Sequence, residues 1–207
     1  MCIRDRTRIG AQLTRDERDQ LLKALQGGDN QKRAVIQAHT RLGLDDIQNK
    51  IRTLEKDDNP LVAGAACAYA ARRQGRTDVL QPLFTQLQDE LAGRRRAAVI
   101  DLGDAGQMAA LPLIVKAPVS MPLRAKSAFQ LVAIERDEII KMPVETQKLM
   151  ASLLRDYPDN LNFRKEWAIP LESEQIEKDL FHRDEGRQYR AVQGLLRMQR
   201  SLSLIHI

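Results

Sequence analysis

Alanines and branched apolar residues gather in the stretch RRRAAVIDLGDAG, residues 94–106. A helix that packs closely between two neighbours places alanine on its near face and larger aliphatic residues, such as Leu102, on its far face. Glycine ends a helix at little cost because it adopts the left-handed backbone conformation. The stretch therefore predicts the second helix of a helix-turn-helix repeat, which Gly103 and Gly106 bring to an end.

The same two-helix pattern recurs along the chain. The predicted second helices end at Gly43, Gly75 and Gly106, at intervals of 32 and 31 residues. A constant period of this size, with two helices per period, is typical of stacked helical repeats. One unit cannot bury its apolar face alone, so neighbouring units share a continuous core. We predict an all-α fold, an α-solenoid in which roughly five or six two-helix repeats form a right-handed superhelix.

Local signals predict where the helices begin and end. Thr14 and Glu17 have the spacing of a capping box. Pro60 fits the first turn of a helix, whereas Pro118 and Pro122 interrupt the fourth repeat. The predicted helices of the first four repeats are residues 14–25 and 31–42, 45–54 and 61–73, 77–87 and 94–106, and 108–116 and 123–134.

The pattern loosens after Glu135. We expect helices at 144–154, 173–181 and 187–198, a turn at 157–160, and an irregular stretch at 164–171 that holds the single tryptophan, Trp167. Ala125 and Ala191 occupy similar places in their predicted helices and lie 66 residues apart, which is about two periods. No linker interrupts this region, so we predict that residues 7–201 form one domain.

The two ends of the chain are related as DNA. One codon choice for MCIRDR, residues 1–6, reads on the opposite strand as LSLIHI, which is the sequence of residues 202–207. This DNA word resembles the end of a transposase-based sequencing adapter. We therefore expect both ends to be adapter-derived and non-native, and residues 7–201 to be truncated at both ends. Cys2 and His206 then carry no functional weight.

Composition excludes several classes of protein. Aromatic residues make up only 4% of the chain, which favours helices packed through small side chains over a sheet core. Cys67 is the only cysteine outside the adapter-like ends, so a disulfide framework and a cysteine-based metal site are excluded. No apolar run approaches the roughly 20 residues needed to cross a bilayer, so we expect a cytoplasmic protein without membrane contact. A formal net charge of +5 is too weak to indicate nucleic acid by itself.

Three segments, RRRAAVIDLGDAG, QKRAVIQAHTRLG and PLRAKSAFQLV, resemble HEAT repeats, and the resemblance covers residues 16–134. Among HEAT proteins, the alanine-rich texture of residues 121–138 is similar to the cyanobacterial phycobilisome group, which includes the phycobilin lyases of the E/F type. The resemblance implies a protein that binds an open-chain tetrapyrrole and helps to attach it to a cysteine of a phycobiliprotein. The chain lacks an NHCY-like motif, which argues against the isomerising lyases.

The resemblance also implies the partners and the ligand. A phycobiliprotein subunit or a paired lyase subunit would be the protein partner. A phycobilin would be bound as substrate, and no resident cofactor is expected. A bilin carries two propionates and a flat conjugated body, so its site needs guanidinium groups and an apolar or aromatic wall.

These requirements single out five residues. Arg94, Arg95 and Arg124 begin second helices, which line the concave face of a HEAT stack, and they are candidates for the propionates. Trp167 is the candidate for the ring system because it lies in an irregular stretch, where functional residues concentrate. Arg190 completes the predicted ligand-binding set. The alternative is that such arginines form ion pairs with acidic residues, each worth about 0–1 kcal/mol at the surface.

Two other functions stay open. The concave face could serve a non-catalytic scaffold for protein–protein interaction, which would use the same residues. A DNA-binding protein would need a basic stripe, which Arg33, Arg96 and Arg124 supply in part, but repeat two offers Ala63 at that position. Nucleic acid is therefore a minor hypothesis.

The remaining reactive or aromatic residues favour structural roles. Cys67 lies in AACAYAA, where a free thiol packs as a small apolar group. Tyr69 is expected to pack between helices, and Tyr189 is a second aromatic residue that could stack on a planar ligand. His39 and His182 have no second histidine or cysteine at the spacing of metal ligands, so no metal site is expected.

Overall fold

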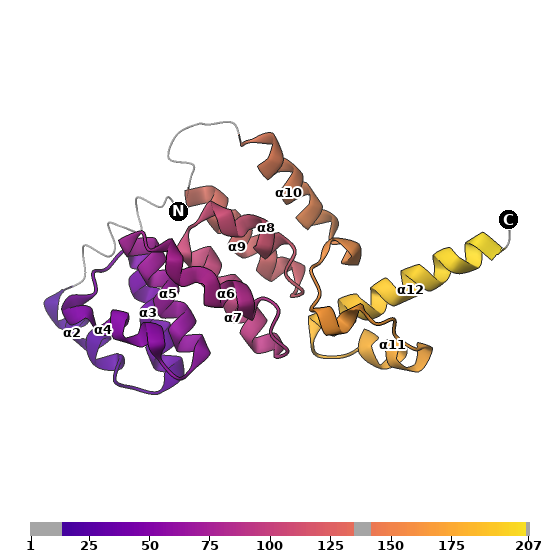
Figure 1. Cartoon of the computed structure of the whole chain (residues 1–207). Coiled ribbons are helices and arrows are strands. Elements are labelled where there is room, and N and C mark those ends of the chain that lie inside the picture. Colours follow the sequence, from indigo (N-terminus) through magenta and orange to yellow (C-terminus); the bar gives the residue numbers. More distant parts are fainter. Residues whose placement is uncertain (1–13, 135–141, 206–207) are drawn as a thin grey trace.

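The computed structural model describes residues 14–134 and 142–205, and it shows helices joined by short turns, with no strand in these ranges (Figure 1). The predicted all-α class is confirmed for this part of the chain. The α-helices are α2 (Arg15–Ala24), α3 (Asp29–Leu42), α4 (Lys50–Thr53), α5 (Pro60–Gln74), α6 (Gln81–Gln86), α7 (Ala92–Ala105), α8 (Leu111–Val115), α9 (Met121–Ile134), α10 (Val144–Arg155), α11 (Ser173–Leu180) and α12 (Glu185–Ile205). The 3-10 turns are η1 (Ile47–Asn49), η2 (Leu54–Lys56), η3 (Thr77–Leu80), η4 (Met108–Ala110), η5 (Pro158–Asn160) and η6 (Lys165–Ala168).

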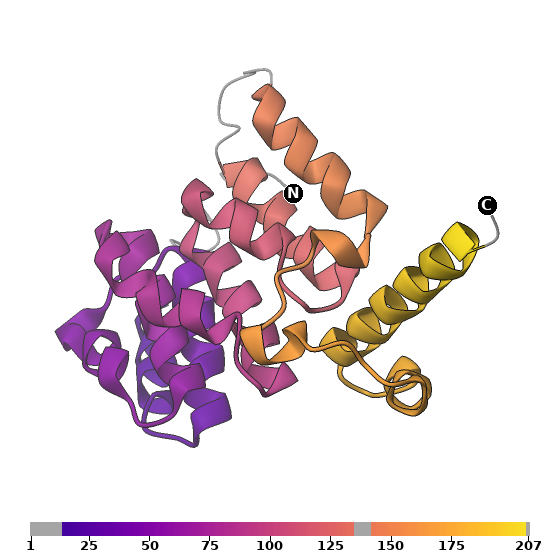
Figure 2. The same cartoon turned by 45° about the vertical axis from the view of Figure 1, so that its right-hand side comes forward.

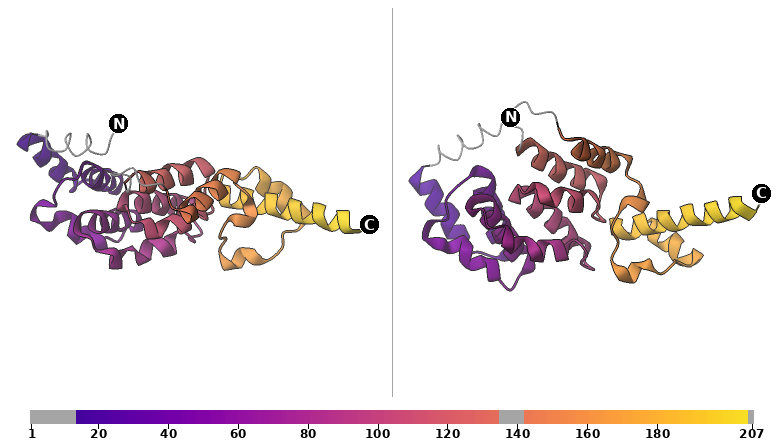
Figure 3. Two further views of the ribbon diagram at one scale, coloured as in Figure 1. Left: turned by 90° about the horizontal axis from the view of Figure 1, so that it is seen from above. Right: turned by 45° about the horizontal axis from the view of Figure 1, so that its top comes forward.

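The longer helices pack in the order of the chain. Helix α3 contacts α5, α5 contacts α7, and α7 contacts α9, while the shorter helices α2, α4, α6 and α8 each lie against the longer helix that follows them. Helix α10 packs on α8 and α9. Seen from above, the elements follow one another along the molecule from α2 to α12 (Figure 3). We call α2–α10 and the residue that caps α10, which together lie in residues 14–134 and 142–156, the helix stack.

The remaining residues, 157–205, form a separate arm that we call the C-terminal unit. It comprises η5, η6, α11 and α12, and α11 packs on α12. Ile176 of α11 fits against Gly194 of α12, where an added Cβ would lie 2.9 Å from the Ile176 side chain. Helix α12 projects away from the helix stack (Figure 2). No helix in the described ranges combines the length and the apolar character that a bilayer crossing requires.

Several predicted helix ends are confirmed. Thr14 and Glu17 form the capping box at the start of α2. Gly43, Gly75 and Gly106 all adopt the left-handed conformation, with φ values of 71°, 68° and 72°. These glycines end α3, α5 and α7 for the reason that the sequence gives, because a side chain would strain the backbone there.

The prediction was wrong at three places. Gly103 does not end a helix: it lies inside α7, where an added Cβ would meet the Cβ of Ser127 at 2.9 Å, so its role is close packing of α7 on α9. Residues 45–54 do not form one helix, because Gln48 and Asn49 have positive φ values of 65° and 53°. Pro122 does not precede α9 but lies in its first turn, where no backbone N–H is needed.

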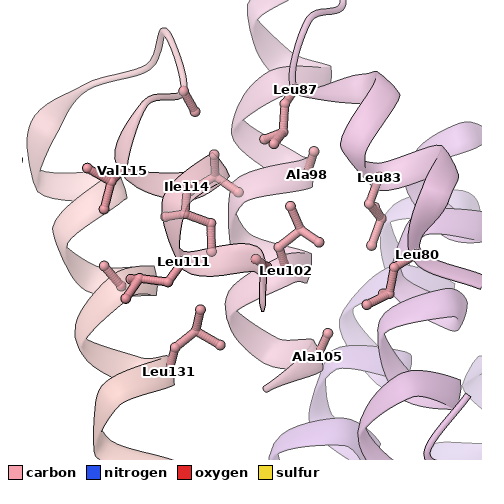
Figure 4. Packing of buried hydrophobic residues seen from close by; sticks show 14 of the residues in the cluster. Leu80, Leu83, Leu87, Ala98, Leu102, Ala105, Leu111, Ile114, Val115 and Leu131 are labelled. Carbon is pink, nitrogen blue, oxygen red and sulfur yellow. The ribbon is translucent and has the colours of Figure 1, made fainter. Parts of the chain in front are cut away.

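A continuous apolar core joins α5 to α10, as Figure 4 shows in part. Leu83, Leu102 and Ile114 have no exposed surface, and Ala98 of α7 is equally buried. The alanines allow the long helices to approach closely, while the leucines fill the space between the layers. A second apolar cluster joins α2, α3 and α5. Among the described residues, neither cluster extends beyond Leu153 of α10.

Ion pairs also cross the helix stack. Arg33 of α3 donates from both terminal nitrogens to the Asp101 carboxylate of α7, at 2.8 and 2.7 Å. Arg41 also binds the Asp104 carboxylate of α7 through two nitrogens, Nε and Nη2, at 2.8–3.0 Å. Helix α5 lies between α3 and α7, and its Gly64 leaves room for the carboxylate, since a Cβ there would lie 3.1 Å from Asp101 Oδ2. These pairs connect second neighbours in the stack.

The adapter-like ends lie mostly outside the described residues. This holds for residues 1–6 and for residues 206–207. The backbone of residues 202–205 continues α12. The structure therefore does not test the origin of these ends.

Candidate ligand site around Trp167

Trp167 lies in η6, on the irregular segment between the helix stack and α11, as the sequence predicts. Its ring is half-buried and lies 6.2 Å from the ring of Phe163. The guanidinium carbons of Arg95 and Arg190 lie over the indole, 5.4 and 5.9 Å from the ring centroid. Three of the five predicted ligand residues thus meet at one place, although they come from α7, η6 and α12.

Arg95 is a buried structural cation with only 1% of its surface exposed. Its guanidinium donates to the carbonyls of Asp89 and Glu90, at 2.8 and 2.9 Å, and to the Asp184 carboxylate. Burial lowers the pKa of Arg95, and Asp184 opposes that shift. These hydrogen bonds offset the free-energy cost of removing the Arg95 guanidinium from water. Arg95 therefore connects the loop before α7 to the turn before α12.

Arg124 has the equivalent role one helix later. It is 1% exposed and donates to the carbonyls of Val115 and Val119, at 2.8 and 3.0 Å. It also pairs with the Asp156 carboxylate and lies 5.5 Å from the centroid of the Tyr189 ring. The Tyr189 hydroxyl donates to Asp156 at 2.8–2.9 Å. Arg124 therefore connects α9 to the C-terminal unit and does not reach Trp167.

The neighbours of Arg95 point elsewhere. Arg94 extends to Asp89, with its Nη1 3.1 Å from the carboxylate. Arg96 binds Glu185 at the start of α12, at 2.6 Å from Nη2 to Oε2. Consecutive residues diverge in this way because each helical step turns the side chain by about 100°. Arg94 therefore lies apart from the site, and Arg96 adds a third link to the C-terminal unit.

Arg190 differs from these arginines. Its Nη2 donates to the Ile169 carbonyl at 2.7 Å, and its Nε is buried without a hydrogen-bond partner. No carboxylate within ion-pair distance of Arg190 is found among the described residues. Burial lowers the pKa of Arg190, while Asp179 opposes this shift only at longer range. A partly desolvated cation without a bonded carboxylate is costly unless an anion joins it.

Two pockets meet at Trp167 and Arg190. The first, which we call the apolar pocket, has a volume of about 510 Å³. Its walls come from η6, the chain that follows it, and α12: Trp167, Ile169, Pro170, Leu171, Arg190, Gln193, Gly194, Arg197 and Met198. The volume lies in the range typical of small-molecule sites. Two guanidinium groups on mostly apolar walls suit a flat ligand with anionic substituents.

The second, which we call the seam pocket, has a volume of about 650 Å³ and lies between α7 and the C-terminal unit. Its lining is polar and comprises Glu90, Leu91, Ala92, Gly93, Arg96, Trp167, His182, Arg183, Asp184, Arg187 and Arg190. The two pockets share Trp167 and Arg190, so one ligand or two could contact both residues.

The other residues singled out in the sequence lie in structural places. Cys67 is buried, and burial raises the pKa of its thiol to about 11, so it stays protonated at neutral pH. Tyr69 is buried and donates from its hydroxyl to the Leu44 carbonyl at 2.9 Å. His39 is buried with Nδ1 2.9 Å from the Val35 carbonyl, and burial lowers its pKa. His182 accepts from the Asp184 N–H at 3.0 Å, which shapes the turn before α12.

Sequence reasoning missed Asp184 and Gly186. Asp184 binds Arg95 and also accepts from the Gly186 N–H at 2.8 Å, so it begins α12 and anchors the unit at once. A Cβ on Gly186 would lie 2.8 Å from Arg95 Nη2 and 3.0 Å from Trp167. The sequence does show an acidic residue two positions before a glycine at a predicted helix start. This pattern indicates only an ordinary helix cap and does not indicate a contact with a distant arginine.

The comparisons connect the chain to one curated protein. No protein-family model matches it. Over 177 residues the chain is 24% identical to an uncharacterized phycocyanin operon protein Y of Pseudanabaena tenuis. The match covers 86% of this chain and 42% of that relative, so the chain spans less than half the length of the relative.

Proposed function

We propose that this chain is a HEAT-like α-solenoid with a phycobilisome-related role, and that it binds an open-chain tetrapyrrole in the apolar pocket beside Trp167. Three observations support the proposal. The long helices pack in chain order, left-handed glycines recur at a constant period, and the chain resembles a phycocyanin operon protein at 24% identity. The lyase or lyase-like role rests on the resemblance of residues 121–138 to the E/F-type group.

The observation that carries the proposal is the state of Arg190. Its guanidinium is partly desolvated, stacks on Trp167, and has a buried Nε without a partner. A propionate in the apolar pocket would give the Arg190 guanidinium an anionic partner, and a carboxylate–guanidinium pair in such a place is stronger than at an open surface. Arg197 lines the same pocket and is the candidate for the second propionate.

The geometry favours Arg190 over Arg95 and Arg124 as a propionate ligand. The latter two are buried and already bonded to Asp184 and Asp156. A ligand carboxylate would have to displace those partners and leave them buried without a cation. We therefore assign Arg95 a positioning role, since it packs against the indole of Trp167.

The proposed mechanism is presentation of a bound bilin. The thioether forms when the acceptor cysteine adds across a carbon–carbon double bond of the bilin: its sulfur bonds to one carbon, its proton passes to the bilin, and no group leaves, so the acceptor supplies the nucleophile. This chain would hold the tetrapyrrole in one orientation and shield one face against the indole of Trp167. No acid or base from this chain is required, and the phycobiliprotein subunit or a paired lyase subunit would be the protein partner.

A second candidate is a scaffold for protein–protein interaction. Phe181 and Ile169 are 87% and 71% exposed on the C-terminal unit. Exposed large apolar side chains occur at protein interfaces. This function would use the outer surface of the C-terminal unit and would require no small ligand.

The test is co-expression of the chain with bilin-synthesis enzymes, followed by the absorbance spectrum of the purified protein. We expect bound bilin, with its absorbance greatly reduced in Arg190→Gln and in Trp167→Leu and retained in Trp167→Phe. Arg52→Gln is the matched control, since Arg52 is exposed on α4 at the far end of the helix stack. Circular dichroism checks that each variant is folded.

The bilin hypothesis is wrong if the protein is well folded but stays colourless, both alone and with a candidate lyase partner. Binding of an apo-phycobiliprotein that Phe181→Asp abolishes and Arg190→Gln leaves intact would then favour the scaffold. If bilin binds and its absorbance is unchanged in Arg190→Gln, the ligand lies elsewhere on the chain.

A further inference from the structure

The seam pocket joins two regions that share little apolar contact. One wall comes from the start of α7 and the loop before it, including Gly93 and Arg96. The other comes from the turn before α12 and from α12 itself, including Arg183 and Arg190. A ligand in this pocket would therefore touch both the helix stack and the C-terminal unit.

Charge in the seam pocket is unbalanced toward cations. Four arginines line it, against the two carboxylates Glu90 and Asp184. Asp184 is already bound by Arg95 and by the Gly186 N–H. The Glu90 side chain is 82% exposed, and its oxygen lies 3.9 Å from Arg164, outside the pocket lining. Neither acid therefore neutralises the arginines of the pocket.

Two of the four arginines have carboxylate partners and two do not. Arg96 binds Glu185, and Arg187 binds Asp179 at 2.6 Å. Within the described ranges, Arg183 and Arg190 have no carboxylate at ion-pair distance, and the Arg190 Nε has no acceptor. Both arginines line the seam pocket, and neither is ion-paired with the carboxylates Glu90 and Asp184 that line it with them.

The start of α7 adds donors to the same pocket. Its N-cap residue, Leu91, offers no side-chain acceptor to the first turn. A Cβ on Gly93 would meet nothing within 4 Å, so a ligand can approach this backbone closely. Helix α7 spans 14 residues, and the positive end of its dipole complements the two arginines.

We propose that the seam pocket binds an oxyanion, a carboxylate or a phosphate group, through Arg183 and Arg190, and that the bound anion strengthens the attachment of the C-terminal unit to α7. The site is distinct from the apolar pocket, although Arg190 and Trp167 line both. Arg183 lines the seam pocket and not the apolar pocket, so anion binding there does not require a bilin in the apolar pocket. The oxyanion could belong to a free phosphate or to an acidic group of a larger ligand.

Trp167 makes the proposal measurable, because it is the only tryptophan in the chain and lines the pocket. Inorganic phosphate is added while tryptophan fluorescence is recorded, with sodium chloride at matched ionic strength as the reference. We expect a saturable change that chloride does not reproduce, and slower hydrogen exchange in α11 and α12. Arg183→Gln, on an exposed side chain, should weaken phosphate binding about tenfold, and Arg52→Gln should not change it.

Further titrations distinguish a phosphate from a carboxylate ligand, and one further variant distinguishes the seam pocket from the apolar pocket. Acetate and succinate replace phosphate in a second titration, and an Arg183-dependent response to either class supports the site. Met198→Gln changes only the apolar pocket and should leave the response intact. A response equal to that of chloride for all three anions, or one that Arg183→Gln leaves unchanged, would overturn the proposal. Neither result bears on bilin absorbance, so the two proposals fail separately.

Discussion

The helix stack and the C-terminal unit are held together by different forces. Within the stack, residues such as Leu102 and Ile114 are fully buried in a continuous apolar core. Between the stack and the C-terminal unit, ion pairs and hydrogen bonds join Arg95 to Asp184, Arg96 to Glu185, and the Asn162 N–H to the Lys116 carbonyl at 2.7 Å, and Arg95 and Arg124 also lie over the rings of Trp167 and Tyr189. Apolar burial is non-directional, whereas ion pairs and hydrogen bonds require one geometry.

This difference has a functional consequence. A boundary built from a few directional bonds can respond to a ligand that adds or removes one of them, while a packed core cannot. Both pockets lie at or beside this boundary.

Arg95→Ala should give the largest effect. It removes the cation that binds Asp184 and the carbonyls of Asp89 and Glu90, and it leaves these groups unpaired. Breaking a buried pair in this way costs about 3–5 kcal/mol. Urea denaturation should show this loss, and hydrogen exchange should accelerate in α11 and α12 before it does in α5. Arg94→Ala is the control, since its half-exposed pair with Asp89 is worth about 0–1 kcal/mol. Equal effects of the two variants would contradict the structural role of Arg95.

Leu102→Ala tests the other side of the comparison. Leu102 has no exposed surface, so its truncation leaves a cavity and should lower the free energy of unfolding by about 2–5 kcal/mol. Exchange should accelerate across α5, α7 and α9 together, because these helices share the core. Leu154→Ala is the matched control on a side chain that is 58% exposed. Acceleration confined to α11 and α12 would show that the stack does not form one cooperative core.

Alanine substitution at two glycines should change the free energy of unfolding in opposite directions. A Cβ on Gly186 would meet Arg95 Nη2 at 2.8 Å and the Pro118 carbonyl at 3.1 Å, so Gly186→Ala should destabilise by about 1–3 kcal/mol. Gly93 lies in the first turn of α7 with open space around it, and alanine there should be neutral or stabilising by up to about 1 kcal/mol. Melting temperatures give the readout. A neutral Gly186→Ala would mean that the C-terminal unit does not approach α7 as closely as the structure places it.

The smallest effect concerns pH and lies in the stack alone. Burial raises the pKa of Asp101 to about 6, and Arg33 reduces that shift without cancelling it. The folded state therefore holds the proton more tightly than the unfolded state. The associated stability is fully present below the ordinary pKa of an aspartate and is lost as pH rises through about 6.

Asp101→Asn should remove this dependence and keep an acceptor for Arg33. Between pH 5 and pH 6, the stability of the parent should fall relative to that of the variant by on the order of 1 kcal/mol. Urea denaturation at the two pH values measures the difference. Asp45→Asn is the control, because Asp45 is an exposed residue that pairs with Arg73 at the surface. Parallel pH profiles for parent and Asp101→Asn would refute the assignment.

Several residues of the candidate site could be chosen from their type and their local sequence, but their contacts could not. The sequence predicts Trp167 as a ligand residue because it is an aromatic residue in an irregular stretch, and Arg190 because it is an arginine on a predicted second helix, and the two suit a planar, anionic ligand. Their contact, at 5.9 Å, depends on how α12 docks and could not be derived from spacing. Arg95 was selected by the same logic, and the structure gives it internal partners instead.

The ion pairs of α7 show why a local pattern cannot assign the partner of a charged residue. Asp101 and Asp104 stand in a buried alanine-rich helix, which is an unfavourable place for two carboxylates unless cations reach them. The cations are Arg33 and Arg41, which lie 68 and 63 residues away in sequence and two helices away in the stack. A local pattern can show that a partner is needed, but it does not show which arginine supplies it.

The helical class, the repeat period and most helix ends could be predicted from the sequence alone. These follow from the spacing of apolar residues, from capping side chains such as Thr14, and from glycines whose backbone preference acts within one turn. The position and the partner of each arginine side chain depend instead on the tertiary structure. Arg94, Arg95 and Arg96 are alike in sequence, yet one lies at the surface, one is buried under the C-terminal unit and one binds α12. Their fates differ because charge pairing depends on distance in space, which the docking of distant helices sets.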